Sequence, residues 1–163
     1  MRKVLFKGKS EAGYKWITKG EWIEGSLLQS EGEKGTACQI VTSYLPNEKN
    51  EPVMAVAYEV NPETVCQYTG FTDENRVKIF EGDYISDGET VWEVVYRKSM
   101  SGFSAKAEGG RIPYEYGWFS LYHLCNGHHG GRKVRVVGNR YEYKGNPSDL
   151  LSRDVEEEER TQP

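Results

Sequence analysis

Short strand-length runs recur along the whole chain, and no segment has the apolar spacing of an amphipathic helix. In the clearest run, residues 90–98, Trp92, Val94 and Tyr96 share one face. A period of two residues is typical of a strand with one buried face. No window shows apolar residues at i, i+3, i+4 and i+7 between proper capping residues. The sequence therefore predicts a mostly β fold with very little helix.

The other strand-like runs are bounded by Gly, Asn, Asp and Pro, which favour turns. Lys19-Gly20 is expected to turn a hairpin between two of these runs. Asn146 before Pro147 predicts one short helical turn, with Asn146 as its N-cap. Residues 119–124 are expected to form either a single helical turn or a strand. The predicted strands cover residues 5–6, 14–18, 21–28, 38–44, 53–60, 65–69, 78–80, 84–85, 102–105 and 134–137.

Length and charge divide the chain into three parts. The 163 residues suit one compact domain or two small ones. We expect residues 1–66 to form an N-terminal β subdomain, packed as an extension on a small SH3-like β-barrel subdomain at residues 67–151. Residues 152–163 contain five acids and two bases, so this acidic tail is expected to be disordered.

Composition argues against several functional classes. The net charge is −4, and a mildly acidic chain is a poor starting point for a dedicated nucleic-acid-binding protein. Three widely spaced cysteines provide no disulfide framework and no CxxC pair. The first residues lack the apolar stretch of a signal peptide, and no window is apolar enough to span a membrane. We therefore expect a soluble, intracellular protein in a reducing compartment.

Two sequence blocks resemble the YopX family of phage and prophage proteins. The central block runs from Gln67 to Asp83 and contains QYTGFTDEN followed by KIFEGD; the closing block contains VVGNRYE and NPSDLL, near Asn139. Weaker matches, GEWIEGSL and YEVNPETV, precede them. The family usually has Asn-Gly where this chain has Asn75-Arg76, and residues 143–145 are additional here. The resemblance implies a mostly β intracellular protein encoded by a phage or prophage, and it implies no particular reaction.

The same blocks are explained by turn chemistry. Asp73 to Arg76 is expected to reverse the chain, with Asp73 or Asn75 bonded to the local backbone and residues 75 and 76 at the centre of a type I′ turn. Gly82 is expected to adopt a positive φ. We therefore interpret the motif as structural and assign no catalytic residue. Its members are Gln67, Tyr68, Thr69, Gly70, Asp73, Asn75, Glu81, Gly82, Asp83, Gly138 and Asn139.

Metal chemistry has two candidate sites, and we favour neither. Imidazole and thiolate bind zinc, and His123, Cys125, His128 and His129 lie in one Gly-rich segment. Their spacing matches no known zinc motif, so an exposed loop is the preferred interpretation. Carboxylates can bind Mg²⁺, and three acids lie in the central block, but acids in turns are ordinary. We therefore expect neither a metal nor another cofactor. The three acids are Asp73, Glu81 and Asp83.

Aromatic and basic residues near the end of the chain form a candidate binding surface. Small β-barrels bind single strands by stacking bases on aromatic rings beside cations. Aromatic packing in the core is the competing interpretation. We predict a non-enzymatic binding or accessory factor whose partner is a protein or a second copy of itself. A weak single-stranded nucleic-acid-binding module and a metal-dependent enzyme are the alternatives. The surface comprises Arg132, Lys133, Arg135, Arg140, Tyr141 and Tyr143.

Overall fold

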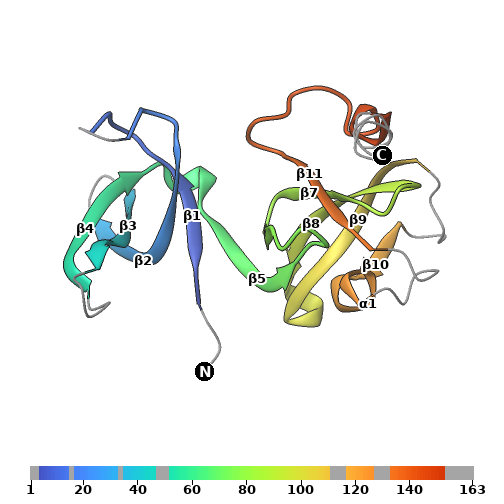
Figure 1. The fold of residues 1–163 in the computed structure, drawn as a ribbon, viewed down its shortest axis with the longest axis horizontal. Helices are drawn as coiled ribbons and strands as arrows, with labels where there is room; N and C mark the ends of the chain where they lie inside the picture. Colours follow the sequence, from blue (N-terminus) through green and yellow to red (C-terminus); the bar gives the residue numbers. More distant parts are fainter. Residues whose placement is uncertain are drawn as a thin grey trace. The chain divides into compact units, whose positions relative to one another are not determined.

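The structure is a computed structural model, and it is mostly β with antiparallel strands (Figure 1). It describes residues 4–14, 17–32, 35–46, 52–110, 117–126 and 133–152. The chain divides into two compact units, Met1–Tyr68 and Thr69–Pro163. The predicted mostly β class is confirmed. The predicted acidic tail, apart from Ser152, lies outside the described residues.

Unit 1 is built from four antiparallel strands in the order β4-β3-β2-β1. The first residues of β5 continue the sheet, with Gln67 opposite Phe6. Ile23, Ile40 and Val60 are the centre of its core, together with Cys38 and Tyr58. The strands and the 3₁₀ helix before β5 are β1 (Phe6–Lys9), β2 (Trp22–Gly32), β3 (Gly35–Pro46), β4 (Pro52–Val60), η1 (Pro62–Thr64) and β5 (Cys66–Thr72).

The strand that precedes β2 differs from the prediction. Residues 15 and 16 of the predicted strand at 14–18 lie outside the described residues, and Tyr14 and Ile17 on either side of them make an isolated bridge with each other. The turn at Lys19-Gly20 exists, with φ of +85° at Gly20 and a hydrogen bond from Glu21 N to Thr18 O. The described residues of this segment therefore do not pair with β2, which pairs with β1 and β3.

Close backbone approach explains one glycine of β2. A Cβ atom at Gly25 would lie 2.1 Å from the carbonyl oxygen of Val41. Real Cβ atoms do not approach a backbone oxygen so closely, so only glycine fits at this point. Gly25 is where β2 changes partner from β1 to β3, since Phe6 faces Gly25 and Val41 faces Ser26.

Unit 2 contains a five-stranded sheet in the order β10-β9-β8-β7-β11. Hairpins join β7 to β8 and β8 to β9. Its described strands form an open sheet with β10 and β11 at the edges, so the predicted SH3-like barrel is not confirmed. The elements are β6 (Lys78–Phe80), β7 (Asp83–Ser86), β8 (Thr90–Arg97), η2 (Lys98–Met100), β9 (Gly102–Gly110), β10 (Trp118–Ser120), α1 (Leu121–Cys125) and β11 (Arg135–Asn139).

Two apolar clusters stabilise unit 2 on opposite faces of β8. Trp92 and Val94 are fully buried on the predicted face, against Leu121 and Leu124 of α1. Val91, on the other face, is equally buried in a cluster with Leu150. Tyr96 does not join the first cluster. It is 46% exposed and contacts Phe103 on β9 edge to face, so the predicted buried face ends before Tyr96.

The predicted helical segments are both present and short. Asn146 Oδ1 accepts a hydrogen bond from Ser148 N, as expected of an N-cap, and a helical turn follows at residues 149–152. Residues 119–124 are divided between the end of β10 and the start of α1. Among the described residues, no helix has both the length and the apolar character needed to cross a membrane.

Candidate functional site

The turn between β5 and β6 is organised by one buried carboxylate. Asp73 Oδ1 accepts hydrogen bonds from Asn75 N and Val77 N, both at 2.8 Å. Arg76 N donates to Asp73 O at 3.0 Å, and Arg76 has φ of +65°. Residues 73–76 thus form a four-residue turn whose last residue is left-handed. The prediction that Asp73 or Asn75 bonds to the local backbone is confirmed, and Asp73 is the residue that does so. The type I′ assignment is wrong, because only Arg76 has a positive φ.

The same turn is attached to β11. Asp73 Oδ2 accepts a hydrogen bond from Val136 N at 3.1 Å, across 63 positions of the chain. Glu74 N donates to Val134 O, and the Glu74 carboxylate lies 3.1 Å from Arg135 Nε. Both Asp73 oxygens are therefore occupied by backbone N–H groups, and this carboxylate acts as a connector between segments.

A second buried carboxylate connects the two motif blocks. Asp83 is 1% exposed. Its Oδ2 accepts a hydrogen bond from Phe80 N and its Oδ1 accepts one from Asn139 Nδ2, both at 2.7 Å. Asn139 Oδ1 in turn accepts a hydrogen bond from Tyr141 N. Gly82 lies in this turn with φ of +79°, as predicted, and its N–H donates to Val94 O.

The remaining motif residues lie in strands and turns. Thr69 Oγ1 donates to Ile79 O and accepts from Phe71 N. Tyr68 N donates to Leu5 O, and Gly70 has φ of +93°. A Cβ at Gly138 would lie 3.2 Å from Leu150 Cδ1. Glu81 is half-buried. Each described contact of the motif serves the backbone or the packing of the fold.

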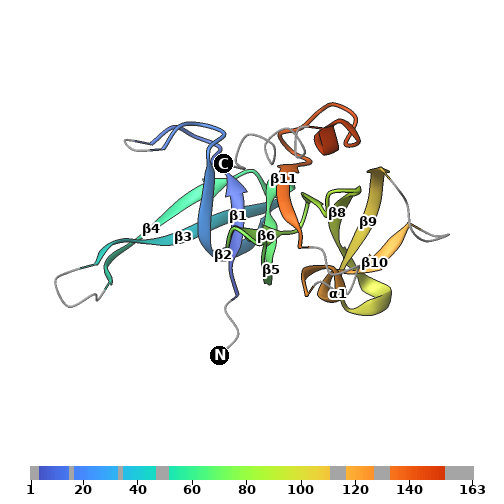
Figure 2. The same cartoon turned by 45° about the vertical axis from the view of Figure 1, so that its right-hand side comes forward.

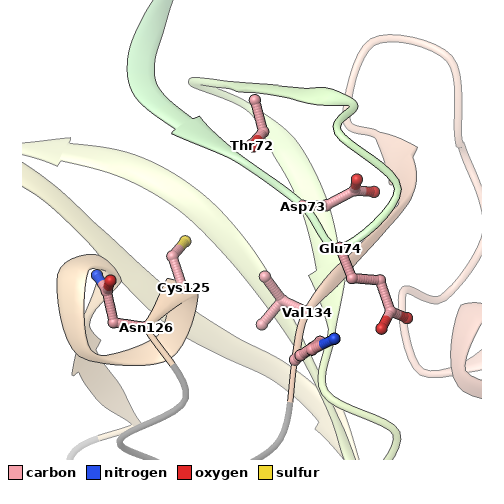
Figure 3. Close-up of a pocket in the computed structure, with 7 residues that line it drawn as sticks. Thr72, Asp73, Glu74, Cys125, Asn126 and Val134 are labelled. Carbon is pink, nitrogen blue, oxygen red and sulfur yellow. The ribbon is translucent and has the colours of Figure 1, made fainter.

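A pocket of about 380 Å³ lies beside the Asp73 turn in unit 2. Figure 3 shows Cys125 and Asn126 on one side of it and Asp73 and Glu74 on the other. Burial, together with the charge of Asp73, raises the pKa of Cys125 to about 12. Cys125 is therefore a neutral thiol at physiological pH, which is a poor nucleophile and a poor metal ligand. The lining residues are Thr72, Asp73, Glu74, Cys125, Asn126, Lys133 and Val134.

The histidines and Cys125 do not form a metal centre within the described part of the chain. His123 and Cys125 are two positions apart on α1, so they do not face each other. The His123 ring instead lies near the rings of Phe119 and Tyr122. His128 and His129 lie outside the described residues. Among the residues that are described, no three His, Cys, Asp or Glu side chains are grouped to hold an ion.

Intramolecular contacts occupy most of the predicted basic and aromatic surface. The Arg140 guanidinium lies 3.1 Å from Glu93 Oε1 and 4.8 Å from the centre of the Tyr141 ring. Tyr143 donates a hydrogen bond to Asn146 O and packs against the Leu150 cluster. Arg135 pairs with Glu74, and Lys133 lines the pocket. Arg132 lies outside the described residues.

The open edge of unit 1 was missed by the sequence prediction. Strand β4 pairs with β3 along its length and with no described strand on its other side. The described residues cover only the end of this edge: Ser10 bridges Val60, and Glu11 N donates to Glu59 O. In Figure 2, β3 and β4 run together beyond β2 as a two-stranded arm. The signal in the sequence is that residues 52–58 contain no charged side chain.

The hydrogen bonds show which residues of β4 face the open edge. Glu59 turns its N–H and C=O away from β3, toward Tyr14 Oη and Glu11 N. Backbone groups alternate along a strand. Val53, Ala55 and Ala57 therefore present theirs to the same edge. We call these three residues the open-edge set. The side chains of Ala55 and Ala57 are exposed.

The fold and its candidate sites define a two-unit antiparallel β protein whose polar motif residues hold turns together. The family model described as YopX protein matches residues 16–150, which is well over half of the chain. The chain belongs to the YopX family, and the resemblance inferred from the central and closing blocks is confirmed. A comparison with curated proteins found no match.

Proposed function

We propose that this YopX family chain is a non-enzymatic binding protein of phage or prophage origin. It acts in the cytoplasm of the bacterial host through the open edge of β4. The observation that carries the proposal is the outer edge of this nine-residue strand, most of which is not paired by described residues, whereas its inner edge pairs with β3. Natural proteins normally protect such edges with charged residues, bulges or very short strands. Residues 52–58 carry no charge, and an unprotected edge favours pairing with another strand.

The state of the reactive side chains supports a binding role over catalysis. The carboxylates of Asp73 and Asp83 are buried, and each accepts hydrogen bonds from the protein on both of its oxygens. The Cys125 thiol is protonated, because burial raises its pKa. Catalytic groups are usually poised near the operating pH and accessible to a substrate. The two carboxylates are instead buried with both oxygens bonded, and the Cys125 thiol is neutral.

Affinity capture from infected or induced cells tests the proposal, with nuclease treatment to remove partners bound through nucleic acid. The wild-type chain is compared with Ala55→Pro, which removes one outward N–H, and with Ala55→Ser, which keeps it. We expect the wild type and Ala55→Ser to capture a protein partner or a second copy even after nuclease treatment. We expect Ala55→Pro to capture neither. Stoichiometric zinc that is lost on mutating His123 or Cys125, together with hydrolytic activity, would overturn the proposal. Loss of all partners on nuclease treatment would also overturn it.

A further inference from the structure

We propose that the partner at the open edge is a second copy of this chain, and that the two β4 strands pair antiparallel about a two-fold axis at Ala55. This inference rests on the proposed function, because it names the partner of the same edge. A two-fold interface brings identical surfaces together. The edge must therefore be complementary to itself in shape, charge and hydrogen-bonding pattern.

The hydrogen-bonding pattern of β4 meets this requirement. In an antiparallel ladder, two residues that exchange both backbone bonds must each turn their N–H and C=O toward the partner strand. An axis at Ala55 places Ala55 opposite Ala55 of the second copy, and Val53 opposite Ala57. All of these belong to the open-edge set. An axis between two neighbouring residues would pair an outward-facing residue with one that faces β3, and no ladder would form.

Charge and side-chain size are also compatible with self-pairing. Like charges directly opposite each other destabilise a strand pair, and residues 52–58 contain none. The side chains nearest the axis, Ala55 and Ala57, are small and exposed. The nearest charged residues are Glu51 and Glu59, each four positions from Ala55. Glu51 precedes β4, and Glu11 N and Tyr14 Oη already occupy the backbone of Glu59. The ladder therefore ends before Glu59.

The length of the arm limits what else can occupy the edge. Thr42 pairs with Val56 and Ser43 with Ala55, whereas the β2 ladder on β3 ends at Ser26 and Val41. This part of β3–β4 is a ribbon of two strands, and such ribbons are marginally stable in water by themselves. Pairing with a second copy would convert two such ribbons into one four-stranded segment, which is a more stable arrangement.

Disulfide trapping tests the register with a matched control. In the proposed register, Ala55 and Ala55 of the second copy form a hydrogen-bonded pair, and their Cα atoms are about 5.5 Å apart. This separation is within the range that a disulfide spans. Residues 57 of the two copies are offset by four positions, roughly 13 Å along the strands at ~3.4 Å per residue. We expect Ala55→Cys to form a covalent dimer under mild oxidation, and Ala57→Cys and the wild type to remain uncrosslinked.

Light scattering of the full chain tests the assembly itself. We expect the measured mass of the wild type and of Ala55→Ser to be twice 18.6 kDa. We expect Ala55→Pro to have the mass of the monomer, with a circular dichroism spectrum like that of the wild type. Proline is tolerated at edge positions whose N–H faces away from the sheet. A monomeric wild type at high concentration, or equal crosslinking of both cysteine variants, would overturn the inference. A monomeric wild type that still captures a different protein through Ala55 would overturn only the inference and leave the proposed function intact.

Discussion

Asp83 Oδ1 accepts a hydrogen bond from Asn139 Nδ2 at 2.7 Å, and both side chains are buried. The two residues are 56 positions apart, one in the central block and the other in the closing block. Their remaining oxygens accept hydrogen bonds from Phe80 N and Tyr141 N. One carboxylate and one amide thus hold β7, β11 and the turns beside them in a single network.

Exchanging these two side chains in a double variant should restore part of the stability that each single substitution loses. Asp83→Asn turns an amide N–H₂ toward the Asn139 amide, and Asn139→Asp places two carboxylates together. We expect each to lower the free energy of unfolding by about 1–3 kcal/mol. In the double variant the new amide can donate to the new carboxylate, so the combined loss should be smaller than the sum by about 0.5–3 kcal/mol. Urea denaturation of all four proteins measures this, and simple additivity would contradict the network.

Asp83→Ala, which keeps no acceptor, should be less stable than Asp83→Asn.

Arg76→Gly should raise stability, because Arg76 occupies the left-handed region at φ of +65°. That conformation costs a non-glycine residue roughly 1–2 kcal/mol, and the extra freedom of glycine in the unfolded chain costs about 0.5–1 kcal/mol. A net gain of about 0.5–1 kcal/mol is expected in urea melts. Arg76→Ala is the control, since it removes the side chain without relieving the backbone. If Arg76→Gly were no more stable than Arg76→Ala, the left-handed backbone at residue 76 would not be strained.

Gly82→Val should be more damaging than Gly82→Asn. Both place a Cβ 3.2 Å from Arg140 Nε and 3.3 Å from Tyr141 Cε2, at φ of +79°. Asn tolerates the left-handed region, whereas a β-branched residue does not. The valine variant is expected to lose about 1–3 kcal/mol, and the asparagine variant less. Thermal melts monitored by circular dichroism would decide, and equal losses would show that steric contact outweighs backbone strain.

The Cys125 thiol should react slowly with iodoacetamide at pH 8. Only the thiolate reacts, and burial raises the pKa from 9.0 to about 12. The thiolate fraction in the native protein is therefore about a thousandfold below that of an ordinary thiol, at roughly tenfold per pH unit. The labelling rate should rise tenfold per unit up to pH 10, as followed by peptide mapping. The protein unfolded in urea is the control, and rapid native labelling at pH 8 would contradict the burial.

The sequence was most informative where a local pattern determines structure. Strand alternation located β8, and Gly82 and the Asn146 cap could be assigned from their own chemistry. Those features depend on a few neighbouring residues, so one sequence contains the information. The resemblance carried by the central and closing blocks also identified the family, although each block looks like ordinary turn chemistry when it is considered alone.

Features that depend on distant segments could not be predicted. Tyr14 and Ile17 belong to a run rich in aromatic and β-branched residues, but β1 and β3 occupy the positions beside β2. Tyr96 has the same periodicity as Trp92, yet α1 covers only part of that face. Asp73 was expected in a local turn, and its bond to Val136 N was not foreseen. The open edge of β4 was overlooked because an uncharged run predicts a strand and says nothing about its neighbours.

The bond between Asp73 and Val136, together with that between Asp83 and Asn139, has a consequence for biosynthesis. Both carboxylates must wait for partners that are translated near the end of the chain, so the sheet of unit 2 cannot be completed while its earlier strands leave the ribosome. Long-range pairing of this kind also slows folding. Nascent chains stalled before residue 133 should therefore remain sensitive to protease within residues 69–110, and chains released after residue 152 should become resistant.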